Sequence, residues 1–203
     1  MADIVVVHGA SGAGKSTHCR NLTQFSLGDK GIYHISAGDR LRAIRLGEFN
    51  SVFSAQVNAP DASDPLDHGL VNGIIFEYIS GCPHNSIVLV DGYPRFRDAI
   101  PYFRKSIDEG RHSLLGCINF TTSRETAMAR FSVRGARRGE RIFGEGTNEW
   151  RFGDYLNITA EAIDAFREFT RVVDIDAEFD IESVWESYMK AFRELVRDEP
   201  LHL

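Results

Sequence analysis

Residues 4–16 read IVVVHGASGAGKS, and this stretch decides the fold. The β-branched run from Ile4 to Val7 predicts a buried strand, and Gly9 to Ser16 match the pattern GxxxxGK[ST] between that strand and a helix. The glycines leave successive backbone N–H groups free to point into the loop, and the following helix adds its positive N-terminal end. The stretch therefore predicts a loop that binds the phosphates of a nucleotide.

The side chains at the end of this loop are expected to have separate roles in binding the nucleotide and Mg²⁺. Lys15 supplies a charge for the outer phosphates, Ser16 a hydroxyl for Mg²⁺, and Thr17 lies within reach of the inner phosphate. A glycine-rich turn that only joins a strand to a helix would need neither the lysine nor the hydroxyl. We expect the nucleotide to contact Gly9, Gly12, Ala13, Gly14, Lys15, Ser16 and Thr17.

The rest of the chain alternates short apolar runs with amphipathic stretches, which predicts an α/β protein of the P-loop NTPase fold with one parallel sheet flanked by helices. The last helix is expected over 180–196, with Pro200 beyond its end. No repeat or linker divides the chain. Five strands are predicted: Ile4 to Val7, Ile32 to Ile35, Ile87 to Val90, Leu114 to Phe120 and Arg171 to Ile175.

Composition and charge narrow the class further. The chain has 203 residues, 43% of them hydrophobic, which predicts one globular domain. A net charge of −6 argues against nucleic acid or a membrane surface as a partner. Three cysteines without metal-ligand spacing, no signal-peptide pattern and no apolar run of about 18 residues predict a cytoplasmic location.

Three further segments are informative together: HISAGDRLR from His34 to Arg42, DGYPR from Asp91 to Arg95, and an arginine series from Arg130 to Arg151. With the glycine-rich loop they occur in the order found in the adenylate kinase family of nucleoside monophosphate kinases, which this chain resembles over nearly its whole length. The resemblance implies ATP and Mg²⁺ as cofactors, a monomer, and phosphoryl transfer to a small-molecule phosphate acceptor. It also implies a core of residues 1–37, 81–133 and 149–203, an acceptor-binding insertion at 38–80 and a short lid at 134–148. Because this lid contains no cysteine, we expect no structural zinc.

By the same resemblance, Arg42 and Arg95 would clamp the acceptor phosphate, Arg134 and Arg151 would reach the transferred group, and Arg130 would lie against the adenine. Arg141 is our choice for the remaining lid arginine, although Arg137 and Arg138 compete for that role. Asp91 ends a buried strand, where its carboxylate can hold Mg²⁺ through water together with Ser16. The expected catalytic residues are Lys15, Arg42, Arg95, Arg134, Arg141 and Arg151, and the expected acceptor contacts are Ser36, Ala37, Gly38, Arg42, Gly92, Arg95 and Ala99.

The chemistry agrees with this assignment. Phosphoryl transfer depends mainly on positioning and on neutralising charge spread over oxygens, and forked, permanently charged arginines suit both tasks. The chain carries 19 Arg against 4 Lys, and residues 124–151 hold seven Arg against four Glu in a chain of net charge −6. Basic charge is thus concentrated where a lid would close.

The position that reads the acceptor base departs from the family. Ala99 stands where adenylate kinases carry Gln and uridylate/cytidylate kinases carry Asn, so the usual amide contact is missing. Arg97 and Asp98 are nearby candidates for that contact. Ala37 is the form common in uridylate/cytidylate kinases and favours CMP or UMP over AMP.

Three functions remain open at this stage. The first is transfer from ATP to a nucleoside monophosphate. The second keeps the chemistry but changes the acceptor to a non-nucleotide molecule that bears a phosphate or phosphonate, for which Ala99 is the argument. The third, a nucleotide-dependent switch, has no use for the two acceptor arginines. The scattered histidines are expected to be surface or packing residues rather than ligands or catalytic bases.

Overall fold

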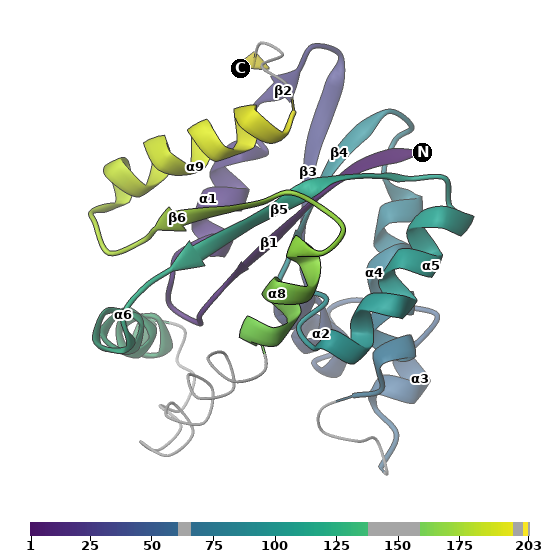
Figure 1. Ribbon diagram of the computed structural model, residues 1–203. Coiled ribbons are helices and arrows are strands. Elements are labelled where there is room, and N and C mark those ends of the chain that lie inside the picture. Colours follow the sequence, from purple (N-terminus) through teal and green to yellow (C-terminus); the bar gives the residue numbers. More distant parts are fainter. Residues whose placement is uncertain (61–65, 138–158, 197–200, 203) are drawn as a thin grey trace.

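The computed structural model describes residues 1–60, 66–137, 159–196 and 201–202. Within these residues one sheet runs in the order β6-β5-β1-β4-β3-β2-β7 (Figure 1). The five predicted strands are confirmed and are parallel to one another. They are β1 (Ala2–Gly9), β3 (Lys30–Ser36), β4 (Ser86–Asp91), β5 (Ser113–Thr121) and β6 (Val172–Asp176).

The sheet is larger than the five strands that were predicted. β2 (Ser26–Leu27) pairs antiparallel with β3, and β7 (Leu201–His202) pairs antiparallel with β2, so the sheet has seven strands in the part of the chain that the structure describes. Each added strand has two residues, which is too short to produce an alternating hydrophobic pattern. Both lie at the edge of the sheet beyond β3, on the side away from β5 and β6.

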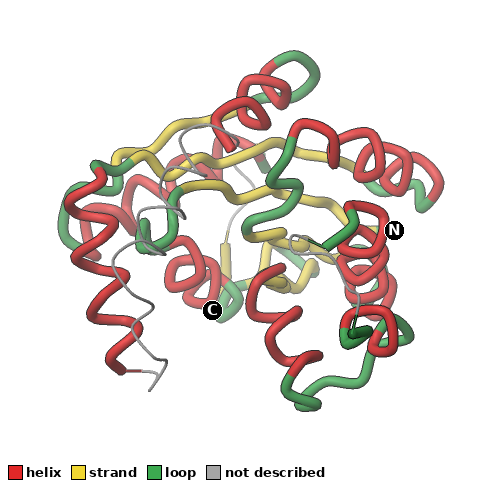
Figure 2. Tube along the Cα trace, turned by 90° about the horizontal axis from the view of Figure 1, so that it is seen from below, coloured by secondary structure: helices red, strands yellow, loops and turns green. Residues whose placement is uncertain are grey.

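Helices cover both faces of the sheet, as Figures 1 and 2 show. α1 (Lys15–Leu22) and α9 (Ile181–Leu195) pack with Val5 and Val7 of β1 on one face. α4 (His68–Gly81), α5 (Ile100–Glu109) and α8 (Ala160–Arg167) pack with Ile4 and Val6 on the other. Because successive residues of a strand point to opposite faces, an unbroken apolar strand is what a sheet covered on both sides requires.

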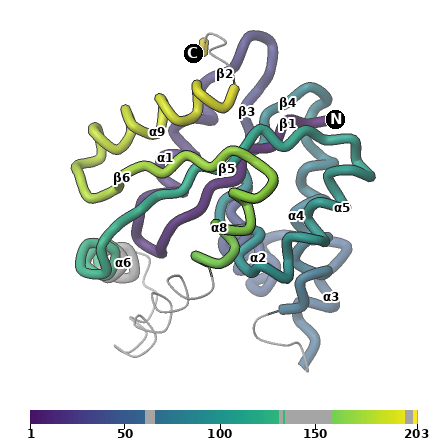
Figure 3. Tube along the Cα trace, in the orientation of Figure 1, coloured from purple at the N-terminus to yellow at the C-terminus, as the bar shows by residue number. Residues whose placement is uncertain are grey.

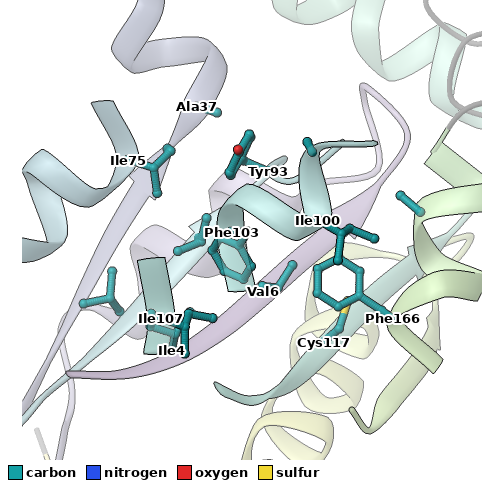
Figure 4. Packing of buried hydrophobic residues seen from close by; sticks show 14 of the residues in the cluster. Ile4, Val6, Ala37, Ile75, Tyr93, Ile100, Phe103, Ile107, Cys117 and Phe166 are labelled. Carbon is teal, nitrogen blue, oxygen red and sulfur yellow. The ribbon is translucent and has the colours of Figure 1, made fainter. Parts of the chain in front are cut away.

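The core between the sheet and α5 is closed by aromatic rings, several of them labelled in Figure 4. Phe103 of α5 meets Phe166 of α8 edge-on, with ring centroids 6.4 Å apart. Tyr93, from the turn after β4, meets the same Phe103 ring at 6.0 Å. The turn that carries the DGYPR motif is therefore anchored in the core by its tyrosine.

A second, smaller core lies among α2 (Ala37–Arg45), α3 (Ser54–Val57) and α4, which follow one another along the chain (Figure 3). Ile44, Val57, Leu66 and Ile74 form it. The predicted break between helices near 58–65 agrees with the end of α3 at Val57, while residues 61–65 lie outside the described residues. α4 also contributes Ile75 and Ile79 to the main core, so it joins the two cores.

The remaining elements lie close to the ends of the strands. A short 3-10 helix, η1 (Arg97–Ala99), precedes α5, and α6 (Arg124–Arg137) begins where a helix was predicted after Ser123. The predicted C-terminal helix is confirmed as α9, whose first N–H groups are capped by Asp180.

No helix in the described part of the chain is long and apolar enough to span a membrane.

The strand register brings the sequence motifs to one edge of the sheet. Asp91 pairs with Val7 of β1 on one side and with Ser36 of β3 on the other. The glycine-rich loop, the SAGD segment and the DGYPR segment therefore leave the sheet side by side, at the carboxyl ends where parallel α/β sheets bind ligands.

Candidate active site

The loop from Gly9 to Ser16 depends on glycine at defined positions. Gly9, Gly12 and Gly14 have φ values of +141°, +92° and +92°. A Cβ at Gly12 would lie 2.2 Å from the Ala127 carbonyl oxygen of α6, and one at Gly9 would lie 2.6 Å from the Phe120 carbonyl oxygen. The loop is thus held tightly between β5 and α6, and the space left for side chains there is filled by backbone.

Lys15 and the start of α1 complete the loop. Lys15 Nζ donates hydrogen bonds to the carbonyl oxygens of Gly9 at 2.7 Å and Ala10 at 2.8 Å, so the lysine is folded back over the loop. The N–H groups of Thr17 and His18 both donate to the Gly14 carbonyl and begin the helix. This arrangement places a cation and a helix N-terminus at the same point, as binding of an anion requires.

Asp91 lies beside the loop at the end of β4 and is buried. Ser16 Oγ donates to Asp91 Oδ2 at 2.5 Å, and His34 Nε2 lies 3.4 Å from the same oxygen. Burial alone would raise the pKa of the Asp91 carboxyl, but the bond from His34, the charge of Lys15 and the bond from Ser16 together hold that pKa below its usual value. Asp91 is therefore an anion at neutral pH. A hydroxyl and a carboxylate in contact beside a phosphate loop are oxygen donors of the kind that Mg²⁺ prefers, so the predicted pair fits that ion.

A cavity of about 430 Å³ adjoins the loop. Loop residues form one wall, and Arg130, Phe179, Ile181 and Val184 form another. Arg130 donates to the carbonyl oxygens of Ala177 at 2.5 Å, Glu178 at 3.2 Å and Phe179 at 2.8 Å, and so fixes the turn between β6 and α9 against α6. The cavity is large enough for a heterocyclic base and is lined mainly by apolar groups.

Sequence reasoning found Arg130 but missed the apolar wall of this cavity. Phe179 and Ile181 are each 59% exposed and line the same cavity, so together they form an exposed apolar patch. Both follow β6, the edge strand next to β5. Their position just after the carboxyl end of a predicted parallel strand was the signal that could have found them.

Two buried histidines near the loop are held neutral. Burial, with the charges of Lys15 and Arg95, lowers the pKa of His8 to about 3. Burial, with the charge of Arg130, lowers the pKa of His18 to about 4. His18 stacks between Phe120 and Trp185, with ring centroids 5.8 and 6.0 Å away. These contacts agree with the prediction that the histidines pack.

The SAGD segment caps a helix. Ser36 ends β3 and accepts a hydrogen bond from the N–H of Asp39 at 3.3 Å, so it starts α2. Ala37 is buried, while Gly38 is exposed with open space beside it. Arg42 Nη1 donates to Asp39 Oδ1 at 2.7 Å, which holds the predicted clamp arginine along the helix at the edge of the site.

The DGYPR segment turns out of β4 towards α4. Gly92 has a φ of +76°, where a side chain would be strained. Arg95 follows two residues after Tyr93 and is partly buried. Ala99 is fully buried among the core residues, so its methyl group offers no surface to a ligand. A direct contact between Ala99 and an acceptor would require this packing to open.

Most of the predicted lid residues lie outside the described residues. Arg134 and Arg137 belong to α6, which ends at Arg137. Arg138, Arg141 and Arg151 lie outside the described residues, as do residues 138–148 of the predicted lid at 134–148. The structure therefore brings together the loop, Asp91, Arg130 and the two acceptor segments, and the roles of the lid arginines stay predictions.

A phosphate loop between β1 and α1, with a buried aspartate beside it, defines a P-loop nucleotide-binding protein. A family model for the AAA domain matches residues 8–142, well over half of the chain. The chain is 25% identical to a UMP-CMP kinase of Sus scrofa over 93% of its own length and 96% of that protein. It is 28% identical to a uridylate kinase of Schizosaccharomyces pombe, covering 95% of this chain and 98% of the relative. It is 27% identical to an adenylate kinase of Leifsonia xyli, covering 85% of this chain and 84% of the relative.

The chain therefore belongs to the AAA domain family and, within the P-loop proteins, to the adenylate kinase family of nucleoside monophosphate kinases, which are phosphotransferases.

Proposed function

We propose that this enzyme transfers the γ-phosphoryl group of ATP, bound with Mg²⁺, to the phosphate of a nucleoside monophosphate, with CMP or UMP preferred to AMP. In the reaction an oxygen of the acceptor phosphate bonds to the γ-phosphorus, the bond between that phosphorus and the β,γ-bridging oxygen breaks, and ADP leaves. The relatives named as UMP-CMP kinase and uridylate kinase support the pyrimidine preference, as does Ala37 in the SAGD segment.

One observation carries the proposal: β1, β4 and β3 end side by side, so that the two segments with Arg95 and Arg42 lie next to the phosphate loop, both on the same side of it. Lys15 would stabilise charge on the donor phosphates, and Ser16 with Asp91 would hold Mg²⁺, which supplies charge neutralisation at the phosphates. Arg42 and Arg95 would each bind the acceptor phosphate with two parallel hydrogen bonds. The donor base would lie in the cavity beside Arg130 and Phe179.

The predicted division of the chain belongs to the same proposal. Residues 38–80 would form the acceptor insertion, and residues 134–148 would form the lid that brings Arg134, Arg141 and Arg151 to the transferred group. Their closure would exclude water and so favour transfer over hydrolysis of ATP. We place the enzyme in the cytoplasm, acting as a monomer.

The test measures ADP release with MgATP against AMP, CMP, UMP, dCMP, dTMP and GMP, together with small phosphonates and sugar phosphates. We expect CMP or UMP to give the highest kcat/KM. Efficient turnover of a phosphonate or sugar phosphate, with every nucleotide inactive, would establish the alternative function in which the pocket serves a non-nucleotide acceptor.

An arginine pair tests the acceptor clamp. Arg95→Ala should abolish transfer and leave ATP affinity unchanged, because Arg95 lies on the acceptor side of the loop. Arg97→Ala is the matched control, since Arg97 is exposed and donates to Glu168 at 2.9 Å. If both variants kept full activity, the assigned acceptor site would be wrong.

A further inference from the structure

The side chain that reads the acceptor base remains to be found. Ala99 is fully buried and has no hydrogen-bonding group. A site that binds one base in preference to others needs such groups, because an unpaired polar edge on the base costs binding free energy. Another residue near Arg95 must therefore supply the contact.

Of the neighbours suggested by the sequence, Arg97 already has a partner. Its guanidinium donates to Glu168, just beyond the end of α8. Phe96, directly after Arg95, contacts a different element: the centroid of its ring lies 5.1 Å from that of His68 at the start of α4. The acceptor turn is thus in contact with an imidazole from the insertion.

Several contacts hold His68 at this place. Tyr93 Oη lies 3.3 Å from the His68 carbonyl oxygen and donates to it, and the Asp67 side chain caps α4 through the Leu70 N–H at 3.1 Å. The His68 side chain is only partly buried, and so is that of Phe96. A ring with two nitrogen atoms is therefore positioned by the backbone, supported by a second ring, and still open to solvent.

We propose that His68 is a specificity-determining residue, whose imidazole hydrogen-bonds the edge of the acceptor base while Phe96 supports the ring. The substrate class that follows is a nucleotide with a planar base bearing donors or acceptors, rather than a phosphonate or sugar phosphate. This inference rests on the proposed function, since it concerns the acceptor of the same reaction.

The experiment compares the wild-type enzyme with His68→Phe, which keeps an aromatic ring against Phe96 and removes both nitrogens. We expect KM for the preferred nucleoside monophosphate to rise about tenfold, the loss expected for one hydrogen bond in a closed site. Discrimination between pyrimidine and purine acceptors should fall by a similar factor, while KM for ATP should not change. Ribose 5-phosphate, which lacks a base, should inhibit both enzymes with the same constant.

Two further variants separate base reading from a merely structural role. His68→Asn restores a donor and an acceptor, so it should recover part of the lost affinity and change the order of preferred bases. Asp98→Asn, at the exposed competing position, should keep the wild-type profile.

The outcomes are distinguishable. A wild-type enzyme without activity on any nucleoside monophosphate would overturn the proposed function and this inference with it. An active wild type whose acceptor profile is unchanged in His68→Phe, or changed instead by Asp98→Asn, would overturn the inference alone. A rise in the inhibition constant of ribose 5-phosphate equal to the rise in KM would do the same, because His68 would then support the site as a whole.

Discussion

The two halves of the candidate active site are built in different ways. On the proposed donor side the backbone forms the site: Gly9 and Gly12 of the loop lie against the backbone of β5 and α6 with no room for a side chain. On the proposed acceptor side, side chains fix the structure: Ser36 caps α2 and Arg42 donates to Asp39 within that helix, while Tyr93 and Phe96 of the turn contact His68 at the start of α4. A backbone site tolerates few substitutions, whereas a side-chain site can change its ligand by exchanging residues. We infer that donor binding is the fixed part of this enzyme and acceptor choice the adaptable part.

The largest effect is expected for Gly12→Ala. The new Cβ would lie 2.2 Å from the Ala127 carbonyl oxygen at a φ of +92°, so the loop must move. Backbone strain of about 1–3 kcal/mol together with this clash should weaken ATP binding at least ~100-fold. Isothermal titration with MgATP measures the loss. Gly28→Ala is the control, since Gly28 also has a positive φ, of +58°, but nothing lies within 4 Å of the added Cβ. Equal ATP affinity in the two variants would contradict the backbone-built donor site.

The pH dependence of stability should differ between a histidine buried beneath the phosphate loop and one on the surface. His8 is buried and its pKa is about 3, against about 6.5 in the unfolded chain, so the unfolded state binds one more proton between these values. Stability must therefore fall as pH decreases below about 6.5, by up to ~1.4 kcal/mol per pH unit from this group. Urea unfolding at pH 7 and pH 4.5 should show a smaller loss for His8→Leu than for the wild type. His202→Ala, at an exposed position, controls for the removal of one imidazole. Identical losses in His8→Leu and the wild type would show that His8 is not kept neutral by the fold.

On the acceptor side, a single hydroxyl should have a moderate effect. Tyr93 Oη lies 3.3 Å from both Asn72 Oδ1 and the His68 carbonyl oxygen, and Tyr93 is buried. Tyr93→Phe should cost about 1 kcal/mol of stability, because the partners lose a hydrogen bond inside the protein. It should also raise KM for the acceptor a few-fold and leave KM for ATP unchanged, because α4 is held less firmly to the turn. Tyr102→Phe, at a half-exposed ring, is the control for both measurements. A change in ATP binding of the same size would mean that the two sides are not built independently.

The contrast between a site formed by the backbone and one formed by side chains also explains which features the sequence could predict. The five parallel strands and the glycine-rich loop were predictable because their residue patterns indicate the local backbone conformation. β-branched runs predict buried strands, and GxxxxGKS fits one local geometry. β2 and β7 were not predictable, since two residues carry no periodicity. The cavity wall at Phe179 and Ile181 was missed because its one signal was the place of these residues just after a predicted strand, and the sequence does not give the strand order that brings that strand end to the loop.

The acceptor side shows most clearly what the sequence could not predict. The sequence showed that Ala99 lacks an amide, but it could not show that Ala99 is buried or that Phe96 meets His68, 28 residues earlier in the chain. Contacts between side chains from separate elements follow from packing, which a local pattern does not encode. Motifs therefore indicated the two candidate acceptor segments, and only the structure showed that His68 packs against one of them.

The smallest effect, and the sharpest contrast with Gly12, is expected at Gly38. An added Cβ there meets nothing within 4 Å, and Gly38 lies in the first turn of α2 without a positive φ. Gly38→Ala should therefore stabilise the protein by about 0.5 kcal/mol through helix propensity, less than in a helix interior. If the open space belongs to the acceptor, the same methyl group should raise KM for the acceptor severalfold while KM for ATP stays constant. Stability from urea unfolding and the two KM values decide between a glycine kept for the substrate and one kept for the fold. A destabilised variant with unchanged KM values would place this glycine, like Gly12, among those the backbone requires.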